Sequence, residues 1–263
     1  MSTLHVAGIQ LDIAWENPAE NFSRAMVLGK QAVQAGARLV VLPEMFATGF
    51  SMSAAQMAAH ASEVVAFGAK ASKELGAWLL AGFAVPGNGD GARPRNAAAV
   101  WNPRGEEVVR YHKIHPFTLA GEDKHYDGGN ALPPTVTIDG VRVTPIICYD
   151  LRFPEIFRAR ASDTDLFCVI ANWPEARRVH WSTLLRARAI ESQVWVLGVN
   201  RVGEGNGLAY SGDSVLVDMW GEVYAERTRQ AGVVGGVVDA GRVSEARTKY
   251  SFLADRRPAV YAG

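Results

Sequence analysis

The order of the apolar runs along the chain constrains its fold more than any other feature. Three early runs, rich in Leu, Val and Ala and predicted as buried strands, are residues 4–9, 39–42 and 78–85. A helix predicted over residues 17–35 opens at Asn17-Pro18 and stops at Gly36, a residue typical of helix C-termini. A second long helix is predicted over residues 54–75. Strands and helices therefore alternate in the first part of the chain.

Hairpins interrupt this alternation further along. Paired short apolar runs predict hairpins within residues 97–111, 135–148 and 214–225, and Asp139-Gly140 supplies a tight turn in the second. The other predicted elements are a short helix after Cys148, strands 166–170, 194–200 and 233–238, and a helix over 181–193. Strand–helix units mixed with hairpins predict an α/β fold in which two mixed sheets pack face to face with helices outside.

We expect one domain over residues 1–263, because no linker, repeat or low-complexity tract divides the sequence. Residues 242–263 are more polar and carry Tyr250, Phe252 and Tyr261. Such a C-terminal tail either packs on another surface, for example a partner subunit, or frays.

Composition narrows the class of protein. The chain has 263 residues, with 27 basic and 27 acidic side chains, so its charge gives no reason to expect a nucleic-acid partner. Its two cysteines lie in predicted strands, which fits a reducing compartment better than a disulfide scaffold. We see no secretory signal and no apolar stretch long enough to span a membrane. The expectation is a soluble, cytoplasmic protein that acts on a small molecule.

Three polar side chains follow apolar strands: Glu44, Lys113 and Cys148. Strand ends in α/β folds open onto ligand crevices, so these residues are candidates for one site. Cys148 stands at a strand-to-helix corner, because Pro154-Glu155 is typical of a first helical turn. Free backbone N–H groups and a helix N-terminus at this corner are expected to favour the thiolate, which is the nucleophile. Cys168, inside an apolar run, is predicted to be a buried structural thiol.

Together these side chains form a base, a cation and a nucleophile, as hydrolysis of an amide requires. Glu44 is predicted to take the thiol proton and return it to the leaving ammonia, general acid–base help worth roughly 10²–10⁴ in rate. Lys113 and the backbone N–H of Tyr149 are candidates to stabilise the oxyanion. Water then hydrolyses the thioester. Glu122, in the glycine-rich segment 120–129, is predicted to orient the amide or support proton transfer.

Other interpretations of these residues are open. Cys148 might instead pair with a histidine, the candidates being His112, His115, His125 and His180. No Cys/His pair has metal-ligand spacing, so no metal is expected. Residues 203–207 (GEGNG) lie between predicted strands and are a weak candidate for binding phosphate. A non-enzymatic protein that keeps the fold is a further alternative, against which the intact Glu44/Lys113/Cys148 set speaks.

The sequence also resembles the nitrilase superfamily of carbon–nitrogen hydrolases over nearly its whole length. The resemblance is carried by LPEMFATGF (42–50), YHKIHPF (111–117), ICYDLRFPE (147–155), ANWPEARRVHW (171–181) and RARAIESQ (186–193). It implies a four-layer αββα sandwich, a homodimer formed through helical faces, and no metal or organic cofactor. It also implies a catalytic triad of Glu44, Lys113 and Cys148, with Glu122 as a second glutamate.

Within the superfamily, PEMFATGFSM, CYDLRFP, NWP and NRVGEGNG are most similar to the ω-amidase branch. That resemblance implies hydrolysis of the terminal amide of 2-oxoglutaramate or 2-oxosuccinamate to the oxo diacid and ammonia. Nitrilases typically place Trp-Glu after the nucleophile, so Tyr149-Asp150 favours amides over nitriles. Deaminated glutathione and N-carbamoyl compounds stay open as alternative substrates.

A 2-oxo acid substrate needs a cation for its distal carboxylate. Arg177 is the preferred candidate because it follows Trp173-Pro174 near a third strand end, and neighbouring Arg178 is a second. Arg188 is a third, although its spacing from Glu191 also fits an ion pair on a helix. Trp173 is predicted to wall the pocket.

Overall fold

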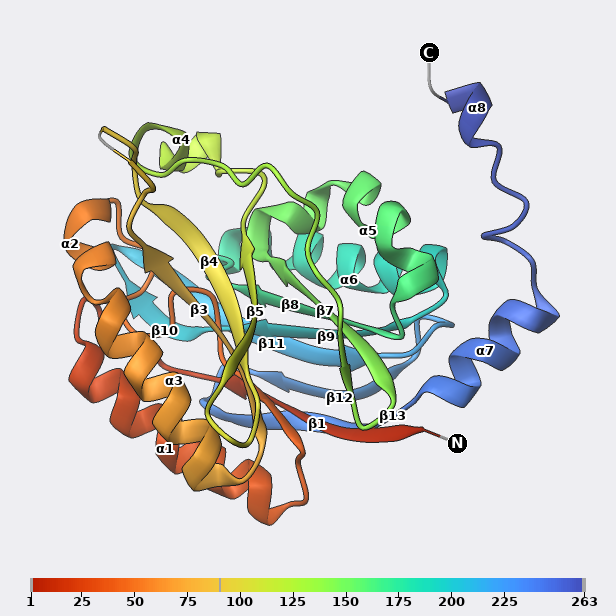
Figure 1. Cartoon of the computed structure of the whole chain (residues 1–263), viewed down its shortest axis with the longest axis horizontal. Coiled ribbons are helices and arrows are strands. Elements are labelled where there is room, and N and C mark those ends of the chain that lie inside the picture. Colours follow the sequence, from red (N-terminus) through yellow and green to blue (C-terminus); the bar gives the residue numbers. More distant parts are fainter. Residues whose placement is uncertain (1, 90, 262–263) are drawn as a thin grey trace.

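The computed structural model describes residues 2–89 and 91–261, which form two mixed sheets with helices outside (Figure 1). The first sheet has six strands, and its central strands β1, β2 and β3 are parallel. Its strands in spatial order are β13 (Gly232–Asp239), β1 (Thr3–Gln10), β2 (Leu39–Val41), β3 (Trp78–Val85), β4 (Arg95–Trp101) and β5 (Glu107–His112).

The second sheet has seven strands, and its parallel centre is β7, β8 and β9. Strand β12 (Val223–Thr228) pairs with β11 and lies off the main path. The other strands in spatial order are β10 (Val202–Gly205), β11 (Leu208–Val217), β9 (Trp195–Asn200), β8 (Leu166–Ala171), β7 (Val141–Ile147) and β6 (Val136–Ile138).

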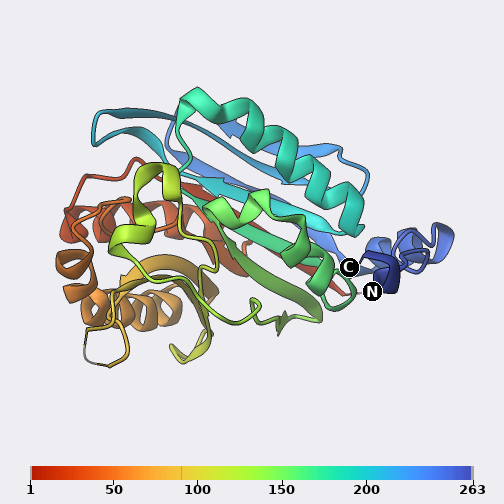
Figure 2. The same cartoon turned by 90° about the horizontal axis from the view of Figure 1, so that it is seen from above.

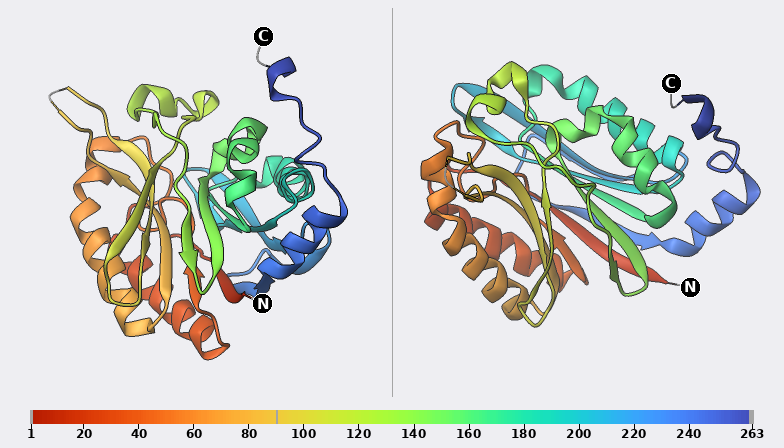
Figure 3. Two further views of the ribbon diagram at one scale, coloured as in Figure 1. Left: turned by 45° about the vertical axis from the view of Figure 1, so that its right-hand side comes forward. Right: turned by 45° about the horizontal axis from the view of Figure 1, so that its top comes forward.

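The helices form the two outer layers, as Figure 3 shows. On the first sheet lie α1 (Pro18–Gln34) and α3 (Ala61–Leu75), and on the second lie α5 (Pro154–Arg160) and α6 (Arg178–Ser192). Strand side chains alternate between the layers: Leu39 and Leu80 pack toward the second sheet, whereas Val40 and Leu79 pack beneath α1 and α3. The predicted fold of two mixed sheets with external helices is confirmed.

Some predicted boundaries are wrong. The single helix expected over residues 54–75 is two helices, α2 (Ala54–Ala59) and α3, which meet at His60. The segment around Gly203–Gly207 is the hairpin of β10 and β11, which the sequence analysis missed. Among the described residues, no helix is long and apolar enough to cross a membrane.

The first part of the expected tail is a helix that contacts its own domain. Helix α7 (Ala240–Lys249) is followed by an extended arm that ends in α8 (Pro258–Tyr261), and Figures 1 and 2 show this arm projecting from the sandwich. The Arg247 guanidinium on α7 donates to the carbonyl oxygens of Ala161 and Thr164. Residues 262 and 263 of the predicted tail lie outside the described part of the chain. The homodimer stays a prediction.

Candidate active site

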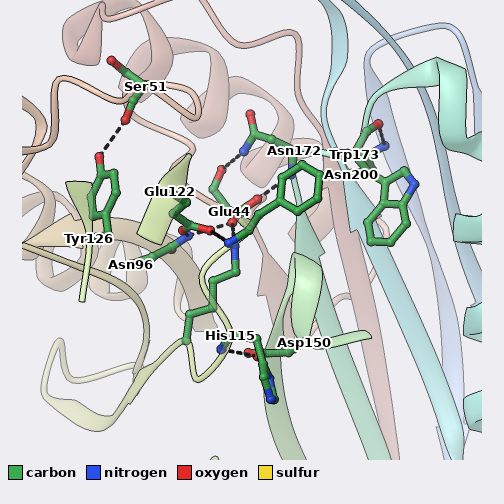
Figure 4. Close-up of polar contacts among 12 residues, drawn as sticks. Glu44, Ser51, Asn96, His115, Glu122, Tyr126, Asp150, Asn172, Trp173 and Asn200 are labelled. Atoms are coloured by element: carbon green, nitrogen blue, oxygen red, sulfur yellow. Dashed lines mark hydrogen bonds and ion pairs between the residues drawn. The ribbon is translucent and has the colours of Figure 1, made fainter. Parts of the chain in front are cut away.

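Glu44, Lys113 and Glu122 meet in a buried polar cluster between the two sheets. Figure 4 shows the two glutamates of this cluster. Lys113 Nζ lies 3.1 Å from Glu44 Oε1 and 2.8 Å from Glu122 Oε2. Glu44 follows β2, Lys113 directly follows β5, and Glu122 begins the short helix α4 (Glu122–His125). The structure therefore brings together three side chains that are far apart in the sequence, including the second glutamate.

The turn that carries Glu44 is packed tightly against β3. The backbone N–H of Gly82 donates to Pro43 O, and the N–H of Phe46 donates to Gly82 O. A β-carbon added at Gly82 would lie 2.7 Å from Glu44 Cα and 3.0 Å from the Met45 nitrogen. Only glycine lets the two backbones approach this closely.

Cys148 begins a 3₁₀ turn (Cys148–Arg152) directly after β7, with a left-handed φ of 46°. Non-glycine residues in this conformation are uncommon and concentrate at functional sites. The residue is 9% exposed and lines a cavity. The predicted strand-to-helix corner is confirmed, since α5 begins at Pro154.

The expectation that this corner favours the resting thiolate is wrong. Burial raises the pKa of the Cys148 thiol well above its ordinary value, and the negative charge of Glu44 raises it further, against a smaller opposing effect of Lys113. A side-chain hydrogen bond to Glu44 adds to this rise in pKa. A thiol whose pKa is raised in this way makes deprotonation part of the reaction.

Lys113 is a buried cation that contacts two acidic side chains, Glu44 and Glu122. Burial lowers the pKa of Lys113, but the charges of Glu122 and Glu44 outweigh it and hold the pKa above its ordinary value. Lys113 therefore stays a cation. Burial raises the pKa of Glu122 above its ordinary value. The Lys113 ammonium acts in the opposite direction and lowers this pKa, without cancelling the rise. The Phe117 N–H also donates to Glu122 Oε2 at 2.5 Å.

A cavity of about 240 Å³ opens beside the thiol, where loops following β2, β5, β7 and β8 converge with the β10–β11 hairpin. Its walls are mostly apolar, with a few polar groups, as in small-molecule sites. The residues that line it are Phe50, Phe117, Leu119, Ala120, Cys148, Tyr149, Arg152, Asn172, Trp173, Pro174, Arg177, Leu208 and Tyr210.

Trp173, Arg177 and Tyr149, all predicted from the sequence, line this cavity. Trp173 Nε1 donates to the carbonyl oxygen of Arg177 at 2.9 Å, which fixes the loop between them. Arg177 forms no ion pair with a carboxylate within residues 2–89 and 91–261, and its guanidinium lies over the Phe117 ring. Neighbouring Arg178 instead binds Asp213.

Arg188 does not reach the cavity, so its predicted role in binding substrate is wrong. Its guanidinium donates twice to the carbonyl oxygen of Leu151, at 3.0 and 2.8 Å, and once to Glu191 at 2.8 Å. Helix α6 thus points Arg188 at the back of the segment that carries Cys148. The spacing that suggested a pair with Glu191 was informative, but it could not show that the side chain is buried.

Arg152 is a cavity residue that the sequence analysis did not single out. It lies one turn after Cys148, stacks over the Trp173 ring with 4.8 Å to the centroid, and contacts His180 Nδ1 at 3.2 Å. In the described parts of the chain it has no carboxylate partner. Its place four residues after the nucleophile was the available sequence signal.

Asp150 joins the nucleophile segment to the strand that precedes Lys113. Its buried carboxylate accepts from Tyr111 Oη at 2.7 Å and from the His115 backbone N–H at 3.0 Å, and it contacts His115 Nδ1 at 2.9 Å. These residues flank Lys113 on both sides in the sequence. Asp150 therefore fixes the relative positions of Lys113 and Cys148.

The histidine alternative has no support in this geometry. No histidine is among the cavity-lining residues, and those at 115 and 180 contact Asp150 and Arg152 instead. Over the described ranges, no group of three His, Cys, Asp or Glu side chains could hold a metal ion. The cluster is arranged for acid–base and nucleophilic chemistry by its own side chains.

We expect Gly82→Ala to lower kcat by about 10²-fold, because its methyl group must displace the Glu44 backbone. Overpacking also lowers the free energy of unfolding by about 1–3 kcal/mol. Gly8→Ala is the matched control, since the atoms nearest to its β-carbon are all in side chains, those of Val199, Val234 and Leu197, and none is in the backbone. Steady-state kinetics and thermal unfolding of both variants check this. Equal losses of kcat in the two would contradict it.

Comparison with known proteins agrees with this geometry. The carbon-nitrogen hydrolase family matches residues 5–248. The chain is 40% identical to ω-amidase YafV of Yersinia enterocolitica, over 86% of each chain, and 31% identical to the 2-oxoglutaramate amidase of Bacillus subtilis, over 97% and 98%. A CN-hydrolase superfamily protein from Xanthomonas campestris superposes with a TM-score of 0.90 at 33% identity, over 98% of each chain. The protein therefore belongs to the carbon–nitrogen hydrolase family of the nitrilase superfamily and is a hydrolase of amide carbon–nitrogen bonds.

Proposed function

We propose that the protein hydrolyses the terminal amide of small 2-oxo acids, such as 2-oxoglutaramate and 2-oxosuccinamate, through a cysteine thioester. One observation carries the proposal: Cys148, next to Glu44, lines a cavity that also holds two arginines without carboxylate partners in the described chain. The names of the relatives from Yersinia enterocolitica and Bacillus subtilis point to the same substrate class.

Acylation begins from the neutral thiol. As the sulfur attacks the amide carbon, the S–H bond breaks and Glu44 takes the proton, so the electron pair of sulfur forms the new C–S bond. The developing oxyanion is stabilised by the Lys113 ammonium and the Tyr149 backbone N–H. Collapse of this intermediate breaks the C–N bond, and Glu44 returns its proton to nitrogen so that ammonia leaves.

Deacylation repeats these roles with water as the nucleophile. Glu44 takes a proton from water as the water oxygen forms a bond to the thioester carbon. Collapse of the tetrahedral intermediate breaks the C–S bond, and Glu44 returns the proton to sulfur. Glu122 holds the Lys113 ammonium at 2.8 Å and so positions the group that stabilises the oxyanion. Its predicted role in orienting the substrate amide stays a prediction. Of the two buried glutamates that contact Lys113, Glu44 transfers the protons and Glu122 positions the lysine.

Arg152 and Arg177 supply the recognition of the distal carboxylate. Both lie in the cavity wall, and a guanidinium binds a carboxylate through a planar pair of donors. A substrate carboxylate would give them the anionic partner that the described protein does not. The reacting amide then lies toward Cys148, and the charged end lies toward the loop with Trp173 and Arg177.

We expect Arg177→Met and Arg152→Met each to raise KM for 2-oxoglutaramate by about 10- to 10²-fold, the range of a lost charge-assisted hydrogen bond. KM for a neutral amide such as butyramide should stay unchanged. Arg178→Met is the matched control, because Asp213 already binds that guanidinium. Kinetics on both substrates check this, and equal KM increases for the two amides would exclude carboxylate binding.

The function itself is tested by ammonia release from a panel of 2-oxoglutaramate, deaminated glutathione and an N-carbamoyl amino acid. The proposal requires the highest kcat/KM for 2-oxoglutaramate. A higher kcat/KM for either other compound would replace the substrate while leaving the amidase class in place. Trapping the acyl group on Cys148 by rapid acid quench and mass spectrometry tests the thioester.

A further inference from the structure

The two carboxylate oxygens of Glu44 are not equivalent. Oε1 accepts from Lys113 Nζ at 3.1 Å and from Asn96 Nδ2 at 2.7 Å, whereas Oε2 accepts from the Asn172 backbone N–H at 2.8 Å. A carboxylate oxygen offers two lone-pair sites. Both sites of Oε1 are therefore filled, and only Oε2 has a site left for a proton.

Asn96 contributes to the difference between the two carboxylate oxygens of Glu44. Its amide nitrogen donates one hydrogen to Glu44 Oε1 and the other to Glu122 Oε1, at 2.7 and 3.0 Å. The side chain is buried in β4, and its carbonyl oxygen has no hydrogen-bond partner in the described structure. The reversed amide would turn that oxygen toward two carboxylates, so the glutamates fix its orientation. Figure 4 shows Asn96 beside both of them.

Charge explains why an amide suits this position. The ionisable groups of the cluster are Glu44 after β2, Lys113 after β5, Glu122 and Tyr126 around α4, and Cys148 after β7. Asn96 binds Glu44 and Glu122 directly. These two acids lie beside a single cation. A neutral double donor holds both acids without adding a charge, which neither aspartate nor lysine could do.

We propose that Asn96 is a positioning residue that, together with Lys113, occupies Oε1 of Glu44 and directs the proton of Cys148 to Oε2. In this step the S–H bond breaks, the Oε2–H bond forms, and the sulfur keeps the electron pair with which it attacks the carbonyl carbon. The same two hydrogen bonds hold Glu44 and Glu122 at a fixed separation. The inference rests on the proposed thioester chemistry, but not on which amide is the substrate.

The experiment compares Asn96→Leu and Asn96→Asp with the wild type. Leucine is close to asparagine in size but donates nothing, and aspartate keeps the shape but adds a third acid. We expect kcat to fall by about 10²-fold in both with KM changed by less than about 3-fold, because a misplaced base affects the chemical step. Asn102→Leu is the matched control, since Asn102 is buried just beyond the other end of β4 and binds only its own turn.

A second readout follows alkylation of Cys148 by iodoacetamide as a function of pH, measured by mass spectrometry. At neutral pH, where Glu44 must take the proton, we expect Asn96→Leu to react about 10-fold more slowly than the wild type. At alkaline pH, where hydroxide removes the proton, the two rates should converge. A merely structural defect would slow alkylation equally at every pH.

The inference is overturned if Asn96→Leu keeps the wild-type kcat and alkylation profile, if Asn102→Leu loses as much kcat, or if the alkylation deficit does not vary with pH. Alkylation also separates this inference from the proposed function. If the wild type hydrolyses none of the amides while the pH-dependent difference in alkylation persists, the proposed substrate class fails and the role of Asn96 stands.

Discussion

Cys148→Ala will lower the rate of ammonia release by roughly 10⁶-fold, the size of effect seen when a covalent nucleophile is removed. The reason is specific: Cys148 is the thiol that lines the cavity, beside the carboxylate of Glu44. Alanine removes the sulfur without adding bulk, so the fold and the cavity should persist. Ammonia release at saturating substrate and circular dichroism measure the two effects.

Cys168→Ala is the control for this variant. Cys168 is fully buried in β8 and does not line the cavity, so its removal should leave kcat unchanged. The free energy of unfolding should fall by about 1 kcal/mol, as is usual for a small change in a core. Equal ammonia release by the wild type and Cys148→Ala would refute the mechanism.

Glu44→Gln will lower kcat by between about 10² and 10⁴, because glutamine cannot take a proton from the thiol. Burial and the charge of Glu44 hold the pKa of the Cys148 thiol above its ordinary value, so little thiolate is present without a base. Glutamine removes that negative charge and therefore lowers the thiol pKa. Activity lost in this variant should thus partly return as the pH rises, which a pH–rate profile to about pH 10 will show.

The histidine alternative makes the opposite prediction. If a histidine were the base, Glu44→Gln would be tolerated and replacing that histidine would abolish activity. His112→Ala and His125→Ala are suitable controls, because neither residue lines the cavity. An inactive histidine variant beside an active Glu44→Gln would contradict the assignment of Glu44.

Local sequence patterns predicted much of the fold. Apolar runs bounded by turn residues gave β1, β3, β8 and β9 nearly to the residue, because a buried strand must be apolar on both faces in these layers. The break of the helix at His60 was missed, since no glycine or proline marks it. Helix α7 was missed because its sequence is mostly polar and its order depends on contacts such as those of Arg247.

The candidate site was only partly predictable. Glu44, Lys113 and Cys148 stood out because strand ends in α/β folds open onto ligand crevices and because together they supply a base, a cation and a nucleophile. All three lie in one cluster. Asn96 gave no comparable signal, because it lies among the alanines of a strand and nothing local shows that it faces two acids. Arg188 was one of three arginines that could bind the distal carboxylate, and its spacing from Glu191 correctly indicated an ion pair, but the direction of its side chain is set by packing of α6 behind Leu151.

The sequence by itself determined which elements form, which residues end the strands, and the set of reactive groups, because strand and turn preferences act over a few neighbouring residues. Only the tertiary structure decided the raised pKa of Cys148 and the pairing of Glu44 with Lys113, Asn96 and Asn172. These properties depend on burial and on charges brought together from distant segments. The electrostatic free energy of a buried group depends on all the groups around it, and local sequence patterns do not identify those groups.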